Sequence, residues 1–197
     1  EVRSNGKGRA YGTELYVRET LPGKINVILS YTYVRSEFTG ANDDLIPSAW
    51  DNRHLFNAIV SKDFKRNWYL GLKWRFVGGS PYTPWDLDRS SLISAWDSRR
   101  QGFLDYSRFN TLRQKNFQQL DLRVDKQYFF GKWSLNLYMD IQNLYNFTQD
   151  GPPNLITQTD DFGNNLIDPL DSNRYLMKNI VNESGTVLPT IGIIVEF

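Results

Sequence analysis

Asp51 and His54 are the first pair of side chains in the sequence that could carry out catalysis. A histidine beside a carboxylate is suited to general acid-base work and to activating a nucleophile. If both residues lie on an extended strand, however, an offset of three positions sends their side chains to opposite faces. His54 is also the only histidine. We therefore expect no enzyme activity and interpret residues 50–54 as the entry of a long connection into a strand.

An acidic segment is the second candidate site. Its oxygen ligands are of the kind that Ca²⁺ accepts, but their spacing does not follow an EF-hand loop, and a solvated turn explains the same residues. The segment comprises Asp160, Asp161, Phe162, Gly163, Asn164 and Asn165, followed by Asp168 and Asp171. We predict no metal site and no cofactor.

Aromatic and arginine side chains gather in the third candidate site, between residues 79 and 118. These residue types often anchor ligands and partner proteins. A connection of this length also needs a small core of its own, which is the alternative interpretation. The residues predicted to contact a ligand are Tyr82, Trp85, Trp96, Arg99 and Arg100.

The elements that position these residues are strands, because apolar and polar residues alternate along most of the chain. The clearest case is 133–142, where Trp133, Leu135, Leu137, Met139 and Ile141 occupy odd positions. The same test predicts strands at 9–20, 25–34, 68–76, 120–125 and 189–197. A further strand is predicted at 54–64, where the sequence does not distinguish the two faces.

Short and long connections alternate between these seven predicted strands. Residues 22–24, 65–67 and 131–132 have the composition of tight hairpin turns. The long connections are 39–52, 79–118 and 148–186. Strict alternation places all tight turns at one end of an antiparallel sheet and all long loops at the other. No helical pattern is convincing anywhere in the chain.

A sheet with one apolar face could be half of a soluble sandwich or the wall of a membrane barrel. Aromatic residues near strand ends, uncharged aliphatic residues at mid-strand and the asymmetry of the loops all favour the wall. On this interpretation, eight charged side chains face the lumen, where they form structural ion pairs. They are Glu14, Arg18, Lys73, Arg75, Asp121, Arg123, Asp125 and Asp140.

Composition narrows the choice of partner. The 197 residues contain 23 Lys and Arg against 22 Asp and Glu, and no cysteine. This balance provides no basic field for a phosphate backbone, so no nucleic acid partner is expected. Disulfides and thiolate metal sites are excluded. No run approaches the ~18 apolar residues of a spanning helix, whereas a barrel strand needs only about 10 alternating residues.

Several segments, in order, resemble the late barrel of TonB-dependent outer-membrane receptors, closest to those of Bacteroidetes-like bacteria. The resemblance covers almost the whole chain. The segments are 10–15 (Ala-Tyr-Gly-Thr-Glu-Leu), 30–33 (Ser-Tyr-Thr-Tyr), 50–54 (Trp-Asp-Asn-Arg-His), 78–84 (Gly-Gly-Ser-Pro-Tyr-Thr-Pro), 117–126, 140–144 and the terminal Phe197.

The resemblance implies a fold and a function. Residues 1–197 would be the C-terminal, all-β part of an antiparallel barrel of about 22 strands with a plugged lumen, long outer loops and short periplasmic turns. The plug, the earlier strands and the motif that contacts the TonB complex would lie elsewhere in a longer protein. The start at Glu1 without an initiator Met fits either a piece of a longer protein or a chain from which a targeting segment has been removed. The protein would import a scarce nutrient across the bacterial outer membrane.

Partners are implied in the same way: outer-membrane lipid, the rest of the barrel with its plug, the assembly machinery and, for some members, a surface lipoprotein. The resemblance implies an assembly signal at Ile191, Ile193, Val195 and Phe197. Two other classes of protein remain open. A small complete barrel or adhesin predicts an even number of strands and a closed ladder. A soluble all-β module that binds carbohydrate or another ligand predicts folding without detergent.

Overall fold

The alternating segments form the long strands of a computed structural model, which describes residues 6–40 and 43–197. The expectation about the start at Glu1 and part of the predicted connection 39–52 lie outside the described residues. The main sheet contains β1 (Gly8–Leu21), β2 (Ile25–Thr39), β3 (Leu45–Pro47), β4 (Arg53–Phe64), β5 (Trp68–Val77), β10 (Phe117–Phe130), β11 (Trp133–Gln142) and β18 (Leu188–Glu196).

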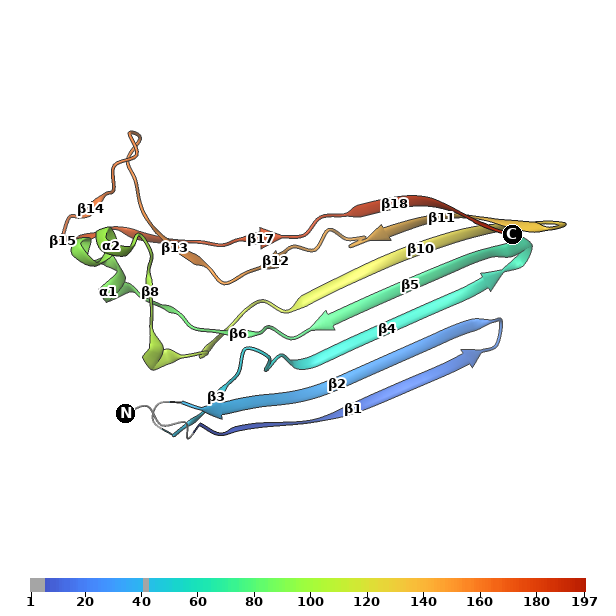
Figure 1. Ribbon diagram of the computed structural model, residues 1–197, viewed down its shortest axis with the longest axis horizontal. Coiled ribbons are helices and arrows are strands. Elements are labelled where there is room, and N and C mark those ends of the chain that lie inside the picture. Colours follow the sequence, from blue (N-terminus) through green and yellow to red (C-terminus); the bar gives the residue numbers. More distant parts are fainter. Residues whose placement is uncertain (1–5, 41–42) are drawn as a thin grey trace.

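The sheet order is β1-β2-β4-β5-β10-β11-β18, with β3 added on β2 (Figure 1). Every neighbouring pair is antiparallel, and the seven long strands follow one another in chain order. The seven strands predicted from alternation are therefore confirmed, and so is the all-β class. The strands β1 and β18 are the two ends of this order.

The three predicted tight turns are also confirmed. Gly23 and Lys24 have positive φ values of 84° and 60° between β1 and β2. The short 3-10 helix η1 (Lys65–Asn67) joins β4 to β5, with Arg66 in the left-handed region. Residues 131–132 join β10 to β11. Glycine tolerates a positive φ without steric cost, which explains its place in the first turn.

The long connections carry small elements of their own. Residues 78–116 contain β6 (Pro81–Tyr82), β7 (Trp85–Asp86), α1 (Leu87–Ser91), α2 (Ile93–Arg99), β8 (Phe103–Leu104), the 3-10 helix η2 (Tyr106–Arg108) and β9 (Leu112–Arg113). Residues 143–187 contain β12 (Gln149–Asp150), β13 (Asn154–Thr157), β14 (Ile167–Asp168), β15 (Asp171–Tyr175), β16 (Met177–Ile180) and β17 (Glu183–Ser184).

The helices α1 and α2 have no counterpart among the elements predicted from the sequence, which has no convincing helical pattern. They have five and seven residues, which is too short to produce a periodic apolar stripe in the sequence. Asp86 accepts a hydrogen bond from the Arg89 backbone nitrogen at 2.9 Å and so caps the start of α1. No helix in the described parts of the chain is long and apolar enough to cross a membrane.

The two long connections pack together into one body, here called the loop lobe (residues 78–116 and 143–187). Its hydrophobic core contains Trp96 and Leu155, each 6% exposed, and these are the buried hydrophobic residues among those described. Trp85 donates from Nε1 to the Pro153 carbonyl at 2.7 Å. The lobe lies at one end of the sheet, opposite the tight turns (Figure 1).

Residues paired across an antiparallel ladder point to the same side, so the register defines two faces. Leu29, Ala58, Trp74 and Leu120 are in register across four strands, and so are Val124, Met139 and Ile191 across three. This side is called the apolar face. The face of the segment 54–64 is thereby decided, since Phe56, Ala58 and Val60 belong to the apolar face. The other side is called the polar face.

Candidate functional site

The apolar face has an aliphatic band between two groups of aromatic residues. Phe64 pairs with Trp68 and Phe130 with Trp133 next to the tight turns. At the lobe end, Tyr33 pairs with His54. The aromatic group of the apolar face at the lobe end comprises Tyr11, Tyr31, Tyr33, His54, Phe56, Trp74 and Phe76. Between the two groups lie Leu29, Val60, Leu72, Leu122, Val124, Leu137 and Met139.

Within the described residues, no second layer of protein covers this band. Leu72, Leu137 and Ile191 are 37%, 38% and 82% exposed. The remaining sheets have two strands each and belong to the loop lobe. A monomeric protein in water rarely exposes so large a contiguous apolar surface. The core that a soluble sandwich would place beneath the sheet lies instead in the lobe.

Lysines near the tight turns lie against aromatic rings of the same face. The Lys126 ammonium is 5.3 Å from the Trp68 ring centroid and 5.0 Å from that of Tyr128. Lys62 lies 5.1 Å from Phe64. Such amphipathic side chains place an apolar stem on the surface and a charge at its border, as at a boundary between oil and water.

The charged residues predicted to share one face do share it. Register places Glu14 opposite Thr32, Lys73 opposite Asp121, and Arg123 opposite Asp140. Arg75 and Asp121 approach to 3.6 Å across strands, and Arg123 pairs with Asp125 at 2.9 Å along one strand. Whether this polar face borders a lumen stays a prediction.

Two hollows lie on the polar face. The larger, about 530 Å³, lies near the tight turns, and its lining includes Asp63, Tyr69 and Asp125. The second, about 410 Å³, includes Lys73, Asp140 and Gln142 in its lining. Tyr69 and Arg123 line both. The mixture of charges is suited to contact with another polar protein surface.

Asp51, predicted only as part of a loop entry, is the centre of a buried ion network. Its side chain is fully buried. One carboxylate oxygen accepts from the Ser36 backbone nitrogen at 3.0 Å and lies 3.2 Å from Arg35 Nε. The other pairs with Arg113 and lies 3.6 Å from Arg53 Nε. Arg113 also donates to the Gly79 carbonyl at 2.9 Å. The network thus ties the start of the lobe to β2.

Burial raises the pKa of Asp51, but the hydrogen bonds from Ser36 and Arg113 together with the nearby arginine charges outweigh it, so the pKa lies below its usual value. His54 is not part of this network. Its Nδ1 forms a 2.8 Å hydrogen bond with the Tyr31 hydroxyl. The catalytic pairing considered from the sequence therefore has no geometric support in the structure.

The predicted ligand contacts in the lobe occupy different environments. Trp96, in α2, is buried, and the Trp85 indole nitrogen donates a hydrogen bond to the Pro153 carbonyl, so both contribute to the core of the lobe. A Cβ on Gly102 would lie 2.9 Å from the Trp85 ring, which shows how tightly this core is packed. Tyr82 pairs with Leu112 in β6–β9. Arg99 and Arg100 are exposed at the end of α2. Ligand contact by these five residues stays a prediction.

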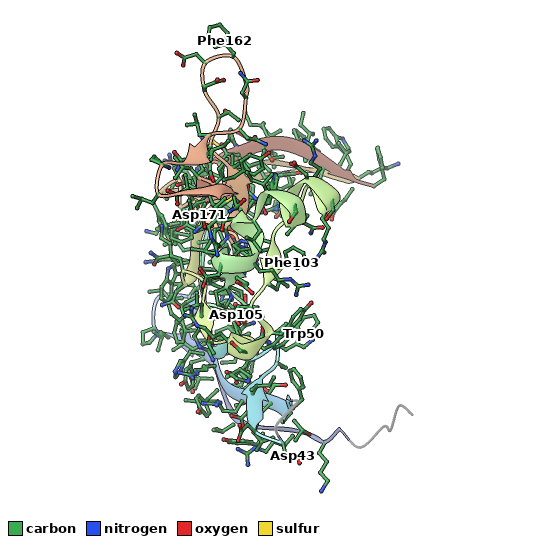
Figure 2. All side chains as sticks on the ribbon, turned by 90° about the vertical axis from the view of Figure 1, so that its left-hand side faces the viewer. Asp43, Trp50, Phe103, Asp105, Phe162 and Asp171 are labelled. Atoms are coloured by element: carbon green, nitrogen blue, oxygen red, sulfur yellow. The ribbon has the colours of Figure 1, made fainter. Side chains whose placement is uncertain are left out.

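The acidic segment forms a hairpin tip, and Phe162 stands at its end (Figure 2). Asp160 accepts from the backbone nitrogens of Phe162 and Asn164 at 2.9 and 2.8 Å. Hydrogen bonds from the Asn164 side chain and these backbone groups lower the pKa of Asp160. Among the described residues, no group of three or more His, Asp or Glu side chains is placed to hold a metal ion.

Fold and surfaces together define an antiparallel β-protein built on one amphipathic sheet, with a lobe of folded loops at one end. Compared with known proteins, the chain matches no family model and none of the curated proteins.

Proposed function

We propose that the chain forms part of the wall and outer loops of a β-barrel in the bacterial outer membrane, and that the barrel is a TonB-dependent transporter for a scarce nutrient. The observation that carries the proposal is the uncovered apolar face, with its aliphatic band between two aromatic groups. In a membrane, lipid tails cover such a band and aromatic rings lie at its two borders.

The dimensions of the band support this interpretation. Trp68 and Phe76 mark its borders on β5 and are eight residues apart. At about 3.4 Å per residue and a tilt of about 40°, this span projects to roughly 20 Å, close to the ~25 Å apolar band of outer-membrane barrels. The asymmetry of the connections also agrees, because such barrels have short periplasmic turns and long outer loops.

Two further features favour a large barrel with a filled lumen. The edge strands β1 and β18 stand at opposite ends of the sheet order, as expected where other strands continue the wall on both sides. The hollows of the polar face present both signs of charge, including Lys73 and Asp140. Such a surface can pair with the polar exterior of a plug. The resemblance of segments 10–15, 78–84 and 117–126 to TonB-dependent receptors adds the transport function.

Single cysteines test the placement in the membrane, because the chain has none of its own. In the complete protein expressed in Gram-negative cells, Asp161→Cys should react with an impermeant maleimide on intact cells. Lys132→Cys, at a tight turn, should react only after the outer membrane is permeabilised. Leu72→Cys should resist the aqueous reagent, and when labelled with a fluorophore in vesicles it should be quenched by nitroxide lipids. Equal labelling of all three cysteine variants on intact cells would refute the proposal that the sheet is part of a barrel wall in the outer membrane.

A genetic comparison tests the transport function separately. Strains that lack the gene or lack TonB should lose uptake of the same compound from a panel of labelled nutrients. Uptake that persists without TonB would overturn the assignment to this class of transporter while leaving the barrel wall in place.

A further inference from the structure

Two arginines of the loop lobe converge on one aromatic ring. The guanidinium carbon of Arg89, in α1, lies 4.0 Å from the centroid of Phe103, and that of Arg99, in α2, lies 4.3 Å from the same centroid. The two positive charges are therefore less than a nanometre apart. The phenyl ring supports both planar groups by cation-π contact, which leaves their N–H donors free at the edges.

The ring that supports them is fixed by the core of the lobe. Phe103 donates its backbone N–H to the Ser90 hydroxyl at 2.8 Å, and Ser90 is fully buried. Phe103 also pairs with Asp86 between β7 and β8. The positions of the two arginines are thus set by elements that are already packed, so little ordering would be needed when a ligand binds.

Nearby carboxylates have other partners. Asp86 caps α1, Asp97 accepts from the Tyr175 hydroxyl at 3.3 Å, and Asp88 lies 3.9 Å from Arg174. Within the part of the chain that the structure describes, the side chains of Arg89 and Arg99 make no ion pair. Two guanidinium groups held close together without an ion-pair partner attract anions, and their fork geometry matches carboxylate and phosphate oxygens.

We propose that Arg89 and Arg99, supported by Phe103, form a binding site for a small anionic ligand that carries carboxylate or phosphate groups. Phe103, the ring of this site, lies on the lobe (Figure 2). Its binding chemistry depends on the lobe alone. Its role, to capture an anionic nutrient at the outer mouth, rests on the proposed transport function.

Binding to the complete protein in detergent tests the site, with citrate and inorganic phosphate as probes, glucose as the neutral control, and isothermal titration calorimetry as the readout. We expect binding of citrate and phosphate but not of glucose. Arg89→Gln and Arg99→Gln should each weaken citrate binding at least about ten-fold, the scale of one lost charge-assisted contact. Arg108→Gln, an exposed arginine of the same lobe that does not contact Phe103, is the matched control and should bind citrate like the wild type.

Two further variants distinguish a specific binding site from non-specific attraction of anions to positive charge. Phe103→Leu retains both arginines but removes their support, and Arg89→Lys retains the charge but loses the fork, so both should bind citrate more weakly. Near-ultraviolet circular dichroism confirms that the lobe stays folded. Absence of citrate binding, or an equal loss in Arg108→Gln, overturns the site. If cysteine labelling still follows the membrane pattern, that failure leaves the proposed function intact.

Discussion

A single arginine placed on either face of the sheet distinguishes a lipid-covered wall from a sheet in water. Leu72 lies in the middle of β5, on the apolar face, between Val60 and Leu122 in the ladder. Ser61 is on β4, on the polar face, and is paired with Asn26 and Gly71. Both substitutions, Leu72→Arg and Ser61→Arg, add the same side chain to a strand that is only partly buried.

The expected magnitudes follow from the environment of each face. In water, a charge at a position that is 37% exposed is nearly neutral, within about 0.5 kcal/mol. In a bilayer, arginine near the midplane costs about 2–4 kcal/mol, equivalent to a roughly 30- to 700-fold shift of the folding equilibrium. Ser61→Arg should change stability little in either case.

Urea titration of the complete protein in lipid vesicles provides the measurement, with electrophoretic mobility and tryptophan fluorescence as independent probes. We expect Leu72→Arg to lower the free energy of unfolding by the amount above and Ser61→Arg to stay near the wild type. If the two variants unfold at the same urea concentration, the apolar face is not covered by lipid and the reasoning fails.

Other predictions concern two buried polar residues, Asp51 beside the lobe and Asn143 within it. Asp51→Asn should destabilise the lobe by about 3 kcal/mol, because Arg35 and Arg113 lose a buried carboxylate, and hydrogen exchange should rise in residues 78–116. Folding lowers the pKa of Asp51, so its contribution to folding stability is complete above the unfolded pKa of about 4 and is lost as the pH falls through the pKa of the folded state. A melting temperature that falls equally with acid in the wild type and in Asp51→Asn would contradict this. Asn143→Ala should lower the free energy of thermal unfolding by about 1–3 kcal/mol, because the Asn143 side chain both donates to and accepts from the Phe147 backbone, at 2.9 and 2.8 Å, and these partly buried backbone groups would lose their partner.

The strands could be predicted because each is long enough for alternation to rise above chance. Residues 133–142 alternate over a whole strand, and tight turns such as 22–24 have a composition of their own. The face of β4 could not be assigned because Ile59 and Val60 are adjacent apolar residues, and only pairing with Lys73 and Leu72 separates them. Which residues of a strand share a face is therefore decided by its pairing with neighbouring strands as well as by its own sequence.

The candidate sites could be predicted from the sequence less well than the strands. Asp51 meets Arg113 across 62 positions, and neither residue has a local signal that indicates the other. Residue type alone groups Trp96 with Arg99, yet Trp96 packs in the core of the lobe and Arg99 lies over Phe103. Only the fold of the lobe shows which aromatic residues stabilise it and which arginines are left at its surface.

The open order of the sheet has a consequence for handling the polypeptide in the laboratory. The strands β1 and β18 each present a row of backbone amides and carbonyls along an edge, and β18 is mostly exposed. Edges of this kind are templates for pairing with another chain. Purified alone and without amphiphile, copies of residues 1–197 should join laterally, β18 of one against β1 of the next, into ribbons that scatter light and bind amyloid dyes.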